Sequence, residues 1–497
     1  MKPLHKPGMS SDRLKKAIEW GLVLTVAGTT LAFGGVVPLA YSLMEVSVFA
    51  LLLTLVIFQT RKGSIDLPVP IALVPIVLFV LLQLVPLPVA LIHWVSPSRT
   101  RIFATSGLLS APDWISLSVY PRQTFESLLK LLAYCTAFVL AAYVFESETR
   151  KSALIRALIL LGAFEAAYGI IQYLTGFQRI FTFVKQYYTE EATGTFINHN
   201  HFAGFLELTA PLLIVQIFYL VQKLSPQGPA RRSRGTSRSN LPVSQIVVLI
   251  IAAVLLLMGA FYSRSRVGIL SIVSSFVFIG LLGQLRMRGR KWMLVTMFIL
   301  AFAVSYAVWI GVGPVLGRYE QLREARYLES EGRLLLWRDG LRIVNDFPAV
   351  GTGLGTFSTI YRRYQTGLVQ LFVDHIHSDY LEFLSELGII GSVFLFGPML
   401  LLWLKIVRVF TVERSRYRRS VLLGCAGSMV AIFIHTATDF NLQIPANAIV
   451  LAIIMGIGYK LAWVEVRAME ALAGGNRTSA GRNSNDELAQ ALKVRPA

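Results

Sequence analysis

Residues 331–357 read EGRLLLWRDGLRIVNDFPAVGTGLGTF, and after a basic and aromatic connector residues 374–391 read DHIHSDYLEFLSELGIIG. This stretch gathers arginines, a glycine-rich turn, two histidines and several carboxylates in a chain whose composition is 55% hydrophobic. Polar chemistry concentrated at one place in an apolar chain needs a functional reason, and the rest of the sequence is arranged around it.

The first half of the stretch has the period of an amphipathic helix. Its apolar residues recur at i, i+3, i+7 and i+10 and form one stripe, while the charged residues point elsewhere. The stripe consists of Leu334, Trp337, Leu341 and Val344. The Phe-Pro pair at 347–348 ends the helix, and three glycines between 351 and 355 predict an irregular turn. We expect this helix to lie on a membrane surface or on the tops of other helices.

In the second half, three carboxylates share one helix face at the start of a new hydrophobic run. They are Asp379, Glu382 and Glu386, at i, i+3 and i+7. Carboxylates at the head of a transmembrane helix are costly unless they face a polar cavity or a cation. The nearby arginines are the partners that we expect for them.

The chain has 497 residues and a mean hydropathy of +0.60, and apolar runs of about 20 residues recur throughout it. This pattern predicts an all-α polytopic membrane protein. A β-barrel would alternate apolar and polar residues with period two, and the sequence shows no such alternation. Cys135 and Cys425 both fall inside apolar runs, so we expect no disulfide framework.

We predict about twelve transmembrane helices. They are centred on residues 18–38, 40–59, 68–94, 125–145, 153–174, 201–222, 243–262, 267–284, 292–312, 380–404, 420–437 and 445–464. Helix breaks are expected at 33–35 and at the LVPLP run, 84–88. The expected organisation is nine helices over 1–312, a large periplasmic loop with amphipathic helices over 313–379, three helices over 380–464, and a polar cytoplasmic tail over 465–497.

The net charge of +19 has a topological explanation, and we expect no nucleic-acid partner. Alternate connections between the predicted spans hold most of the basic residues, including the runs RRSRGTSR, RMRGRK and ERSRYRR. The positive-inside rule therefore places these connections and both termini in the cytoplasm. The segments with candidate chemistry then lie on the opposite, outer side.

Arginines on the outer side run against this sorting bias. The set consists of Arg264, Arg266, Arg318, Arg323, Arg326, Arg333, Arg338, Arg342, Arg362 and Arg363. They predict an anionic partner at the outer leaflet, most simply phosphate or pyrophosphate, which guanidinium groups bind bidentately. For Arg264 and Arg266, in the short turn YSRSRVG, the alternative is snorkelling at the membrane interface.

His377 is the candidate general base, because a neutral imidazole beside carboxylates can take a proton from a hydroxyl. It follows Asp374 and His375 closely. The alternative is a pair of histidines that hydrate a helix N-terminus. An HxH pattern with scattered carboxylates is a weak metal signal, so we predict no metal and no cofactor.

Two further polar groups leave alternatives open. Asn198 and Asn200 precede the span at 201–222, where they either bind a substrate or cap the helix. His435 and Asp439 lie at i, i+4, and we expect them to form a structural pair at the end of the span at 420–437.

Seven motifs occur in an order that resembles the O-antigen ligase and polymerase superfamily of bacterial membrane glycosyltransferases. They are FGGVVPLA, LLQLVPLP, GTFINHNHFAGFLEL, SRSRVGIL, GRLLLWRDGLRIVNDFPAVGTGLGTF, HIHSDYLEFLSELGIIG and HTATDFNLQIPANA, and they span most of the chain. The resemblance implies a GT-C-like fold in the bacterial inner membrane and a metal-independent, inverting enzyme with a periplasmic active site. The implied donor is a glycan linked to undecaprenyl pyrophosphate.

The functional residues of that family carry over to Arg266, Arg333 and His377, which the resemblance implies to be catalytic. The two arginines would bind the pyrophosphate and stabilise its growing charge. His377 would orient or deprotonate the acceptor hydroxyl, with Glu382 or Asp374 holding the imidazole or the sugar. The residues expected to bind substrate are Arg264, Arg338, Asp374, His375, Glu382, Asn198 and Asn200. At Ser392 the chain departs from the ligase pattern, which has Gly, Thr or Tyr there.

Three acceptors fit the implied reaction: a lipid A-core sugar in a ligase, a second lipid-linked unit in a polymerase, and a protein hydroxyl in an oligosaccharyltransferase. The sequence does not separate them. The alternative from another class is a flippase or transporter of the same membrane lipid. A transporter is expected to show inverted repeats or charges at mid-membrane depth, whereas the ionisable residues here cluster at one face.

Overall fold

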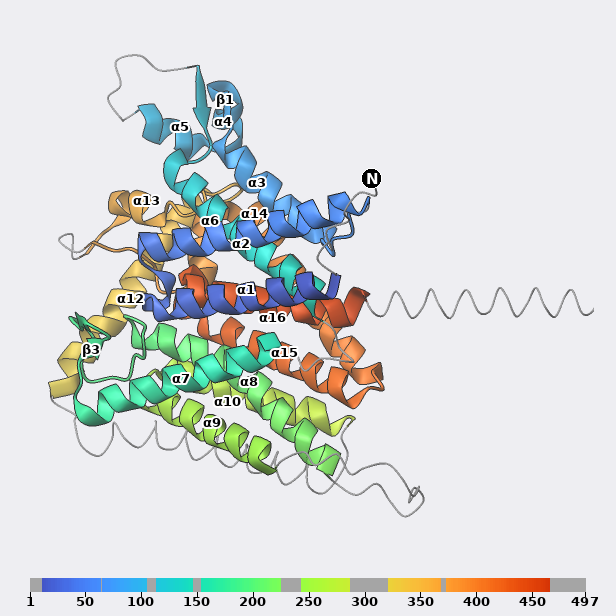
Figure 1. Ribbon diagram of the computed structural model, residues 1–497. Coiled ribbons are helices and arrows are strands. Elements are labelled where there is room, and N and C mark those ends of the chain that lie inside the picture. The colour runs from blue at the N-terminus through green and yellow to red at the C-terminus, as the bar shows by residue number, and fades with distance from the viewer. Residues whose placement is uncertain are drawn as a thin grey trace, which may run out of the picture.

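The computed structural model describes residues 11–63, 65–104, 113–145, 153–224, 243–286, 321–367 and 372–464. Most of these residues form helices that lie side by side in one bundle (Figure 1). The long helices are α1 (Ser11–Leu31), α2 (Pro38–Arg61), α6 (Pro121–Val144), α7 (Ala153–Thr175), α8 (His199–Leu224), α9 (Val243–Tyr262), α10 (Arg266–Gln284), α12 (Gln321–Asp346), α14 (Asp379–Val412), α15 (Arg416–His435) and α16 (Pro445–Tyr459).

Shorter elements connect the long helices. They are the 3-10 turns η1 (Phe33–Gly35), η2 (Ile71–Leu73) and η4 (Asn441–Gln443), the helices α3 (Val74–Leu84), α4 (Val89–Val95), α5 (Pro97–Ala104) and α13 (Phe357–Tyr364), and the π-helical turn η5 (Lys460–Val464). Two small antiparallel strand pairs complete the fold. They join β1 (Pro86–Pro88) to β2 (Trp114–Ser116) and β3 (Arg179–Ile180) to β4 (Phe183–Val184).

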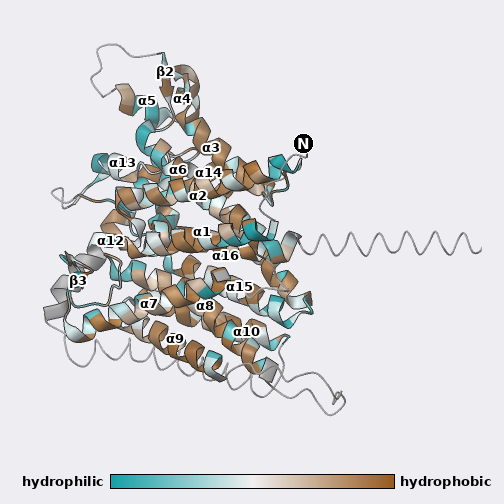
Figure 2. Ribbon diagram, viewed as in Figure 1, coloured by the Kyte–Doolittle hydropathy of each residue, from teal (hydrophilic) through white to brown (hydrophobic). Residues whose placement is uncertain are grey.

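Nine helices of the described ranges are long and apolar enough to cross a membrane: α2, α6, α7, α8, α9, α10, α14, α15 and α16. Apolar residues run along the length of the bundle, and hydrophilic residues gather towards its ends (Figure 2). The chain is a polytopic, all-α membrane protein, as its hydropathy predicts.

The remaining three of the twelve predicted spans are not among these nine helices. The segment at 68–94 is not one helix, because an apolar helix of Ile71–Leu84 gives way to β1, where the two prolines cannot donate helical hydrogen bonds. The first predicted span is α1, which is 21 residues long but begins with a cluster of charged side chains. The expected helix at 292–312 and the expected tail at 465–497 lie outside the described residues. The predicted break at 33–35 is confirmed as η1, where Gly34 has φ +68°.

Helices α15 and α16 form the centre of the bundle and are the most buried of the nine spans. Hydroxyls tie α15 to its neighbours, since Ser428 Oγ donates to Leu208 O at 2.7 Å and Ser275 Oγ donates to Gly427 O at 2.7 Å. At Gly456 the backbone of α16 lies so close to Phe138 O of α6 that any side chain would collide with it. Small residues of this kind allow membrane helices to approach each other closely. The packed centre fixes the ends of α8, α14 and α15 relative to one another.

Helix α12 covers one end of the bundle, and part of its predicted apolar stripe faces away from the protein. Leu334 and Leu341 are 61% and 51% exposed, whereas Asp339, Ile343 and Phe347 are buried. An exposed apolar stripe is compatible with the expected position on a membrane surface, and a carboxylate is acceptable in the buried face once it is hydrogen-bonded. Asp339 accepts hydrogen bonds from the backbone N–H and the hydroxyl of Thr366, at 2.9 and 2.8 Å.

Candidate functional site

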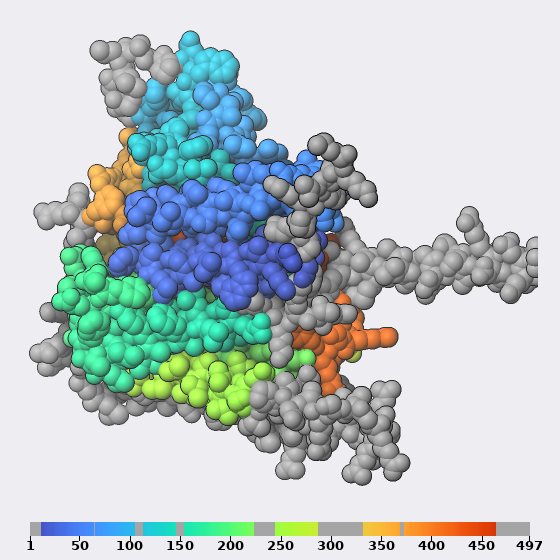
Figure 3. Space-filling model, in the orientation of Figure 1, coloured from blue at the N-terminus to red at the C-terminus, as the bar shows by residue number. Residues whose placement is uncertain are grey.

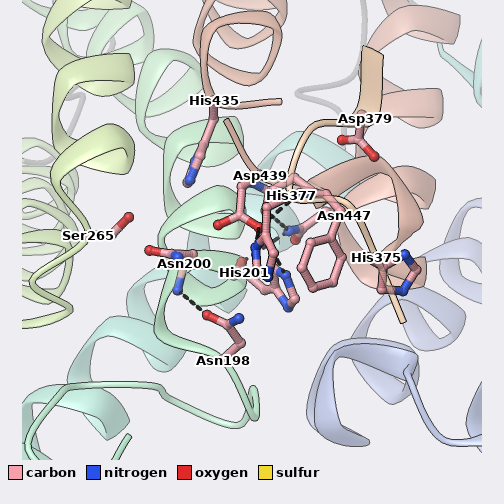
Figure 4. A network of polar contacts seen from close by, with 12 residues as sticks. Asn198, Asn200, His201, Ser265, His375, His377, Asp379, His435, Asp439 and Asn447 are labelled. Carbon is pink, nitrogen blue, oxygen red and sulfur yellow. Dashed lines mark hydrogen bonds and ion pairs between the residues drawn. The ribbon is translucent and has the colours of Figure 1, made fainter. Parts of the chain in front are cut away.

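Four of the seven histidines meet at one end of the bundle, where α8, α14 and α15 begin or end (Figure 4). They are His201, His375, His377 and His435. His201 lies in the first turn of α8, His375 and His377 lie just before α14, and His435 is the last residue of α15. Polar side chains from distant parts of the sequence are therefore brought to one place.

His377 is held in an unusual backbone conformation. Its φ is +55°, in the left-handed region that residues other than glycine rarely adopt. The next residues fix this geometry: Ser378 caps α14, and the N–H of Asp379 donates to Thr436 O at 3.0 Å and to Asp439 O at 3.1 Å. Strain held by surrounding hydrogen bonds is frequent at functional sites. The His377 side chain is 30% exposed.

The three carboxylates at the start of α14 are buried, but their partners are not arginines. Asp379 accepts from the N–H of Leu442 at 2.8 Å, Glu382 from that of Ile376 at 3.0 Å and Glu386 from that of Phe357 at 2.9 Å. Among the described residues the expectation of arginine partners was therefore wrong, because backbone N–H groups bind one oxygen of each carboxylate, while Asp379 Oδ1 and Glu386 Oε2 accept no hydrogen bond. Each carboxylate attaches a different loop to α14.

Glu382 also holds His375, whose Nδ1 lies 2.7 Å from Glu382 Oε1. Burial alone would lower the pKa of His375, but the Glu382 carboxylate outweighs it and the pKa is raised. The His375 ring stacks on Phe440 at a centroid distance of 4.2 Å. The rings of His201 and His377 approach the same phenyl ring edge to face. Phe440 thus packs against three of the four histidines.

Asp439 lies between two histidines at the centre of the cluster. Its Oδ1 is 3.7 Å from His377 Nδ1 and 3.7 Å from His201 Nε2, and it accepts a 2.8 Å hydrogen bond from the N–H of Phe440. Burial raises the pKa of Asp439, but the two histidines outweigh burial and hold this pKa well below its usual range. Asp439 is therefore the carboxylate beside His377, in place of the expected Glu382 or Asp374. Asp374 itself is exposed.

The expected structural pair of His435 with Asp439 is also replaced. His435 Nδ1 lies 2.9 Å from Glu207 Oε2, and both side chains are fully buried. Glu207 belongs to α8, two turns after the helix begins. The i, i+4 spacing failed as a guide because α15 ends at His435, so Asp439 no longer lies on the same helix face.

For the asparagines of the cluster the sequence left two roles open, substrate binding and helix capping, and the structure contains the helix cap. Asn198 precedes α8, and its Oδ1 accepts a 2.8 Å hydrogen bond from the N–H of Asn200. Capping of the α8 N-terminus by Asn198 is thus confirmed, and Figure 4 shows Asn200 beside the histidines. A role of either residue in binding a substrate stays a prediction.

Two of the arginines predicted to act flank Ser265, which Figure 4 shows beside this cluster, and a third, Arg333, interacts electrostatically with His435. Arg266 is exposed and begins α10 directly after Ser265, whose hydroxyl caps the helix by accepting from the N–H of Gly268 at 3.2 Å. Arg333 is half-buried on α12 and interacts electrostatically with His435. Arg264 has φ +55° and lies 3.5 Å from both Glu190 and the hydroxyl of Tyr173.

Arg338 has a different environment from these three. Its guanidinium donates to the hydroxyl of Thr366 at 2.9 Å and lies 4.0 Å from Asp339 Oδ1. These contacts hold the chain after α13 against α12. The structure thus gives Arg338 a place in the cap formed by α12 and α13.

A large apolar cavity lies within the bundle on the side of α3 and α6. Its volume is about 530 Å³, and its walls come from α3, α6, α14 and α16. Lys130 is the one lysine in this wall, and Leu442 and Gln443, just after Phe440, form part of the lining. An apolar chain at membrane depth fits such walls.

Residues 251–396 match the family model of O-antigen ligase. This part of the chain is similar to the O-antigen ligase family. No curated protein matches it. The matched region contains Arg264, Arg266, Arg333 and His377, so the family comparison covers the arginines and the candidate base. His201, Glu207, His435 and Asp439 lie outside it; the sequence had marked His435 and Asp439 only as a structural pair, and the geometry brings all four to the site.

Sequence reasoning missed Asp439 and Glu207 as parts of the site. Glu207 carried a usable signal, because an ionisable residue inside an apolar span marks a function by default. Asp439 had no such signal apart from its place in the motif HTATDF, because its two histidine partners, His201 and His377, are far away in the sequence. Only the fold brings these segments together.

Proposed function

We propose that the protein transfers a glycan from undecaprenyl pyrophosphate to an acceptor hydroxyl at the periplasmic face of the inner membrane. The observation that carries this proposal is His377, partly exposed and backed by the buried Asp439, in a cluster edged by Arg333. A histidine oriented by a carboxylate can take a proton from a hydroxyl. The similarity of residues 251–396 to the O-antigen ligase family supports a glycosyl transfer.

In the proposed reaction, Arg266 and Arg333 bind the diphosphate of the donor. Guanidinium groups bind phosphate oxygens bidentately and neutralise the charge that grows as the bond to the anomeric carbon breaks. Arg266 also begins α10, so the N-terminal end of the helix dipole adds to the attraction for an anion. A diphosphate is a good leaving group, so positioning and charge neutralisation supply much of the rate.

His377 then deprotonates the acceptor. Its Nδ1 faces Asp439, which leaves Nε2 for the hydroxyl that attacks the anomeric carbon from the side opposite the diphosphate, with inversion. We propose that Arg264, His375, Glu382 and Asn200 shape the sugar site. Arg338, Asp374 and Asn198 are proposed substrate contacts at its margin. No metal takes part in this scheme.

The acceptor is a lipid A-core sugar, a second lipid-linked glycan or a protein hydroxyl, corresponding to a ligase, a polymerase or a protein oligosaccharyltransferase. The apolar cavity beside the site supports substrates that carry a lipid chain. A transporter of the same lipid is the alternative from another class. A transporter would move the lipid without forming a glycosidic bond.

Transfer by purified protein tests the proposal. The donor is a glycan on undecaprenyl pyrophosphate, each acceptor is offered separately, and a chelator is present. We expect one acceptor to be modified, with loss of at least about 10²-fold in rate for Arg266→Ala, Arg333→Ala and His377→Ala. Unchanged transfer by both arginine variants contradicts the diphosphate site, and a requirement for added divalent metal contradicts the metal-free scheme. Lipid movement across proteoliposomes without any transfer favours the transporter.

A further inference from the structure

The pair of Glu207 and His435 is a second carboxylate and histidine unit beside the first. It lies between α8 and α15 and is fully buried, with Nδ1 of the imidazole 2.9 Å from Glu207 Oε2. Burying an ion pair contributes little or no net stability compared with apolar side chains of similar size. Packing alone therefore gives no account of a glutamate and a histidine at this depth.

One nitrogen of the His435 ring lacks a hydrogen-bond partner within the part of the chain that the structure describes. Nε2 is buried and makes no hydrogen bond to any described residue. Leaving such a group unsatisfied costs about 1–3 kcal/mol. Figure 4 shows the ring directed towards the space between Asn200, Ser265 and Asp439. The unsatisfied nitrogen thus faces the candidate site.

Charged groups from several elements surround this space. Glu207 comes from α8, Arg333 from α12 and Asp439 from the turn after α15, and His201 of α8 also interacts electrostatically with His435. Arg266 follows Ser265 directly at the start of α10. A diphosphate held by Arg266 and Arg333 would lie beside His435.

We propose that His435, oriented by Glu207, is a second catalytic histidine that donates a proton to the leaving diphosphate. This inference rests on the proposed glycan transfer and deepens it. The acceptor hydroxyl gives its proton to His377 as its oxygen bonds to the anomeric carbon. The bond from that carbon to the diphosphate oxygen breaks, and His435 Nε2–H protonates that oxygen. Returning one proton from His377 to His435 restores both residues.

The pH profile of transfer distinguishes this role from a structural one. An acid must be protonated to act, so the alkaline limb of the kcat profile belongs to His435 and the acid limb to His377. His435→Gln is expected to lower kcat by about 10²-fold and to remove the alkaline limb. Glu207→Gln keeps a side chain of similar size and is expected to shift that limb to lower pH, because the imidazolium loses its carboxylate.

The control variant is His93→Gln, since His93 is exposed and bonded to Thr100 in another part of the molecule. It is expected to leave both limbs unchanged. A structural role of His435 predicts fewer active molecules with the same two limbs, and that result overturns the proposal. If His435→Gln does not fold, Glu207→Gln serves as the test. An alkaline limb at the wild-type pH in Glu207→Gln then overturns the proposal.

Binding of inorganic pyrophosphate to the full-length protein in detergent separates this inference from the proposed function. We expect His435→Gln and Arg266→Ala each to weaken binding by about tenfold or more, since each removes a hydrogen bond to a charged group. If only Arg266→Ala weakens the binding of pyrophosphate, the arginine site stands and the role of His435 is overturned. Full binding by both variants contradicts the diphosphate site as well.

Discussion

At the scale of single residues, the proposed chemistry depends on the Asp439 carboxylate beside His377. We predict that Asp439→Asn lowers kcat by at least about 10²-fold, because an amide neither stabilises the imidazolium nor selects its tautomer as a carboxylate does. The measurement is the transfer rate of purified protein. Asp346→Asn is the matched control, since this exposed carboxylate on α12 accepts a 2.6 Å hydrogen bond from the Tyr364 hydroxyl. A wild-type rate for Asp439→Asn would show that Asp439 does not orient the base.

The contact of His375 with Glu382 predicts a pH dependence of stability. The pKa of His375 is raised in the folded state, so its stabilising effect is fully present below its unfolded value of about 6.5 and is lost as pH rises through the folded value. We expect the melting temperature in detergent to fall between pH 6 and pH 9. Asp439, with its lowered pKa, titrates below this range and contributes no slope there.

The matched variant for this prediction is His375→Asn, which keeps a hydrogen-bond donor near Glu382 without a titrating imidazole. Its melting temperature is expected to vary less over the same pH range. An equal slope in the variant and the wild type would assign the pH dependence to other groups.

At the scale of elements, the glycine-rich turn and α14 form one unit through their backbones. Helix α14 is interrupted at Gly388, whose φ of +62° and ψ of −172° are open almost only to glycine. The turn pairs with this interruption: the N–H of Ile389 donates to Pro348 O at 2.8 Å, and that of Gly353 donates to Glu386 O at 2.9 Å. The turn thus holds the start of α14, which carries the carboxylates of the site.

We predict that Gly388→Ala destabilises the protein by roughly 2–6 kcal/mol, from backbone strain and a collision with the Ala349 carbonyl. Gly63→Ala is the control, because Gly63 also has a positive φ, +76°, but a Cβ there meets no atom within 4 Å. It should cost only about 1–2 kcal/mol. Thermal unfolding in detergent measures both. Equal effects would show that the contact of the turn with α14 adds nothing to stability.

The sequence predicted the helices and their breaks better than the contacts between them. Hydropathy identified the nine apolar helices, and the Gly and Pro residues marked the breaks at η1 and β1, because both signals are local. The buried Asp339 on α12 was not predicted, because its hydrogen bond from Thr366 comes from a residue outside the helix. The partners of His377 and His435 were likewise unpredictable, because α8 and the turn after α15 supply them from distant parts of the chain.

At the scale of the whole molecule, α14 connects the site to the opposite side of the membrane. Its 34 residues, at 1.5 Å each, span about 50 Å, more than the roughly 30 Å of an apolar bilayer core. The histidine cluster lies at its first residue, and the basic turn before α15 follows its last. From the positive-inside rule we propose that the cluster lies on the periplasmic side, where the proposed lipid-linked glycan donor would be presented.

Cysteine labelling in cells tests this orientation. In a chain with Cys135 and Cys425 changed to alanine, Arg362→Cys lies in the exposed part of α13 near the site, and Arg414→Cys lies in the exposed turn between α14 and α15. We predict that a membrane-impermeant maleimide, given access to the periplasm, labels Arg362→Cys in intact cells and Arg414→Cys only after lysis. The two variants control for each other, since both positions react in lysate. The reverse pattern would place the cluster in the cytoplasm and remove the periplasmic donor from the proposed reaction.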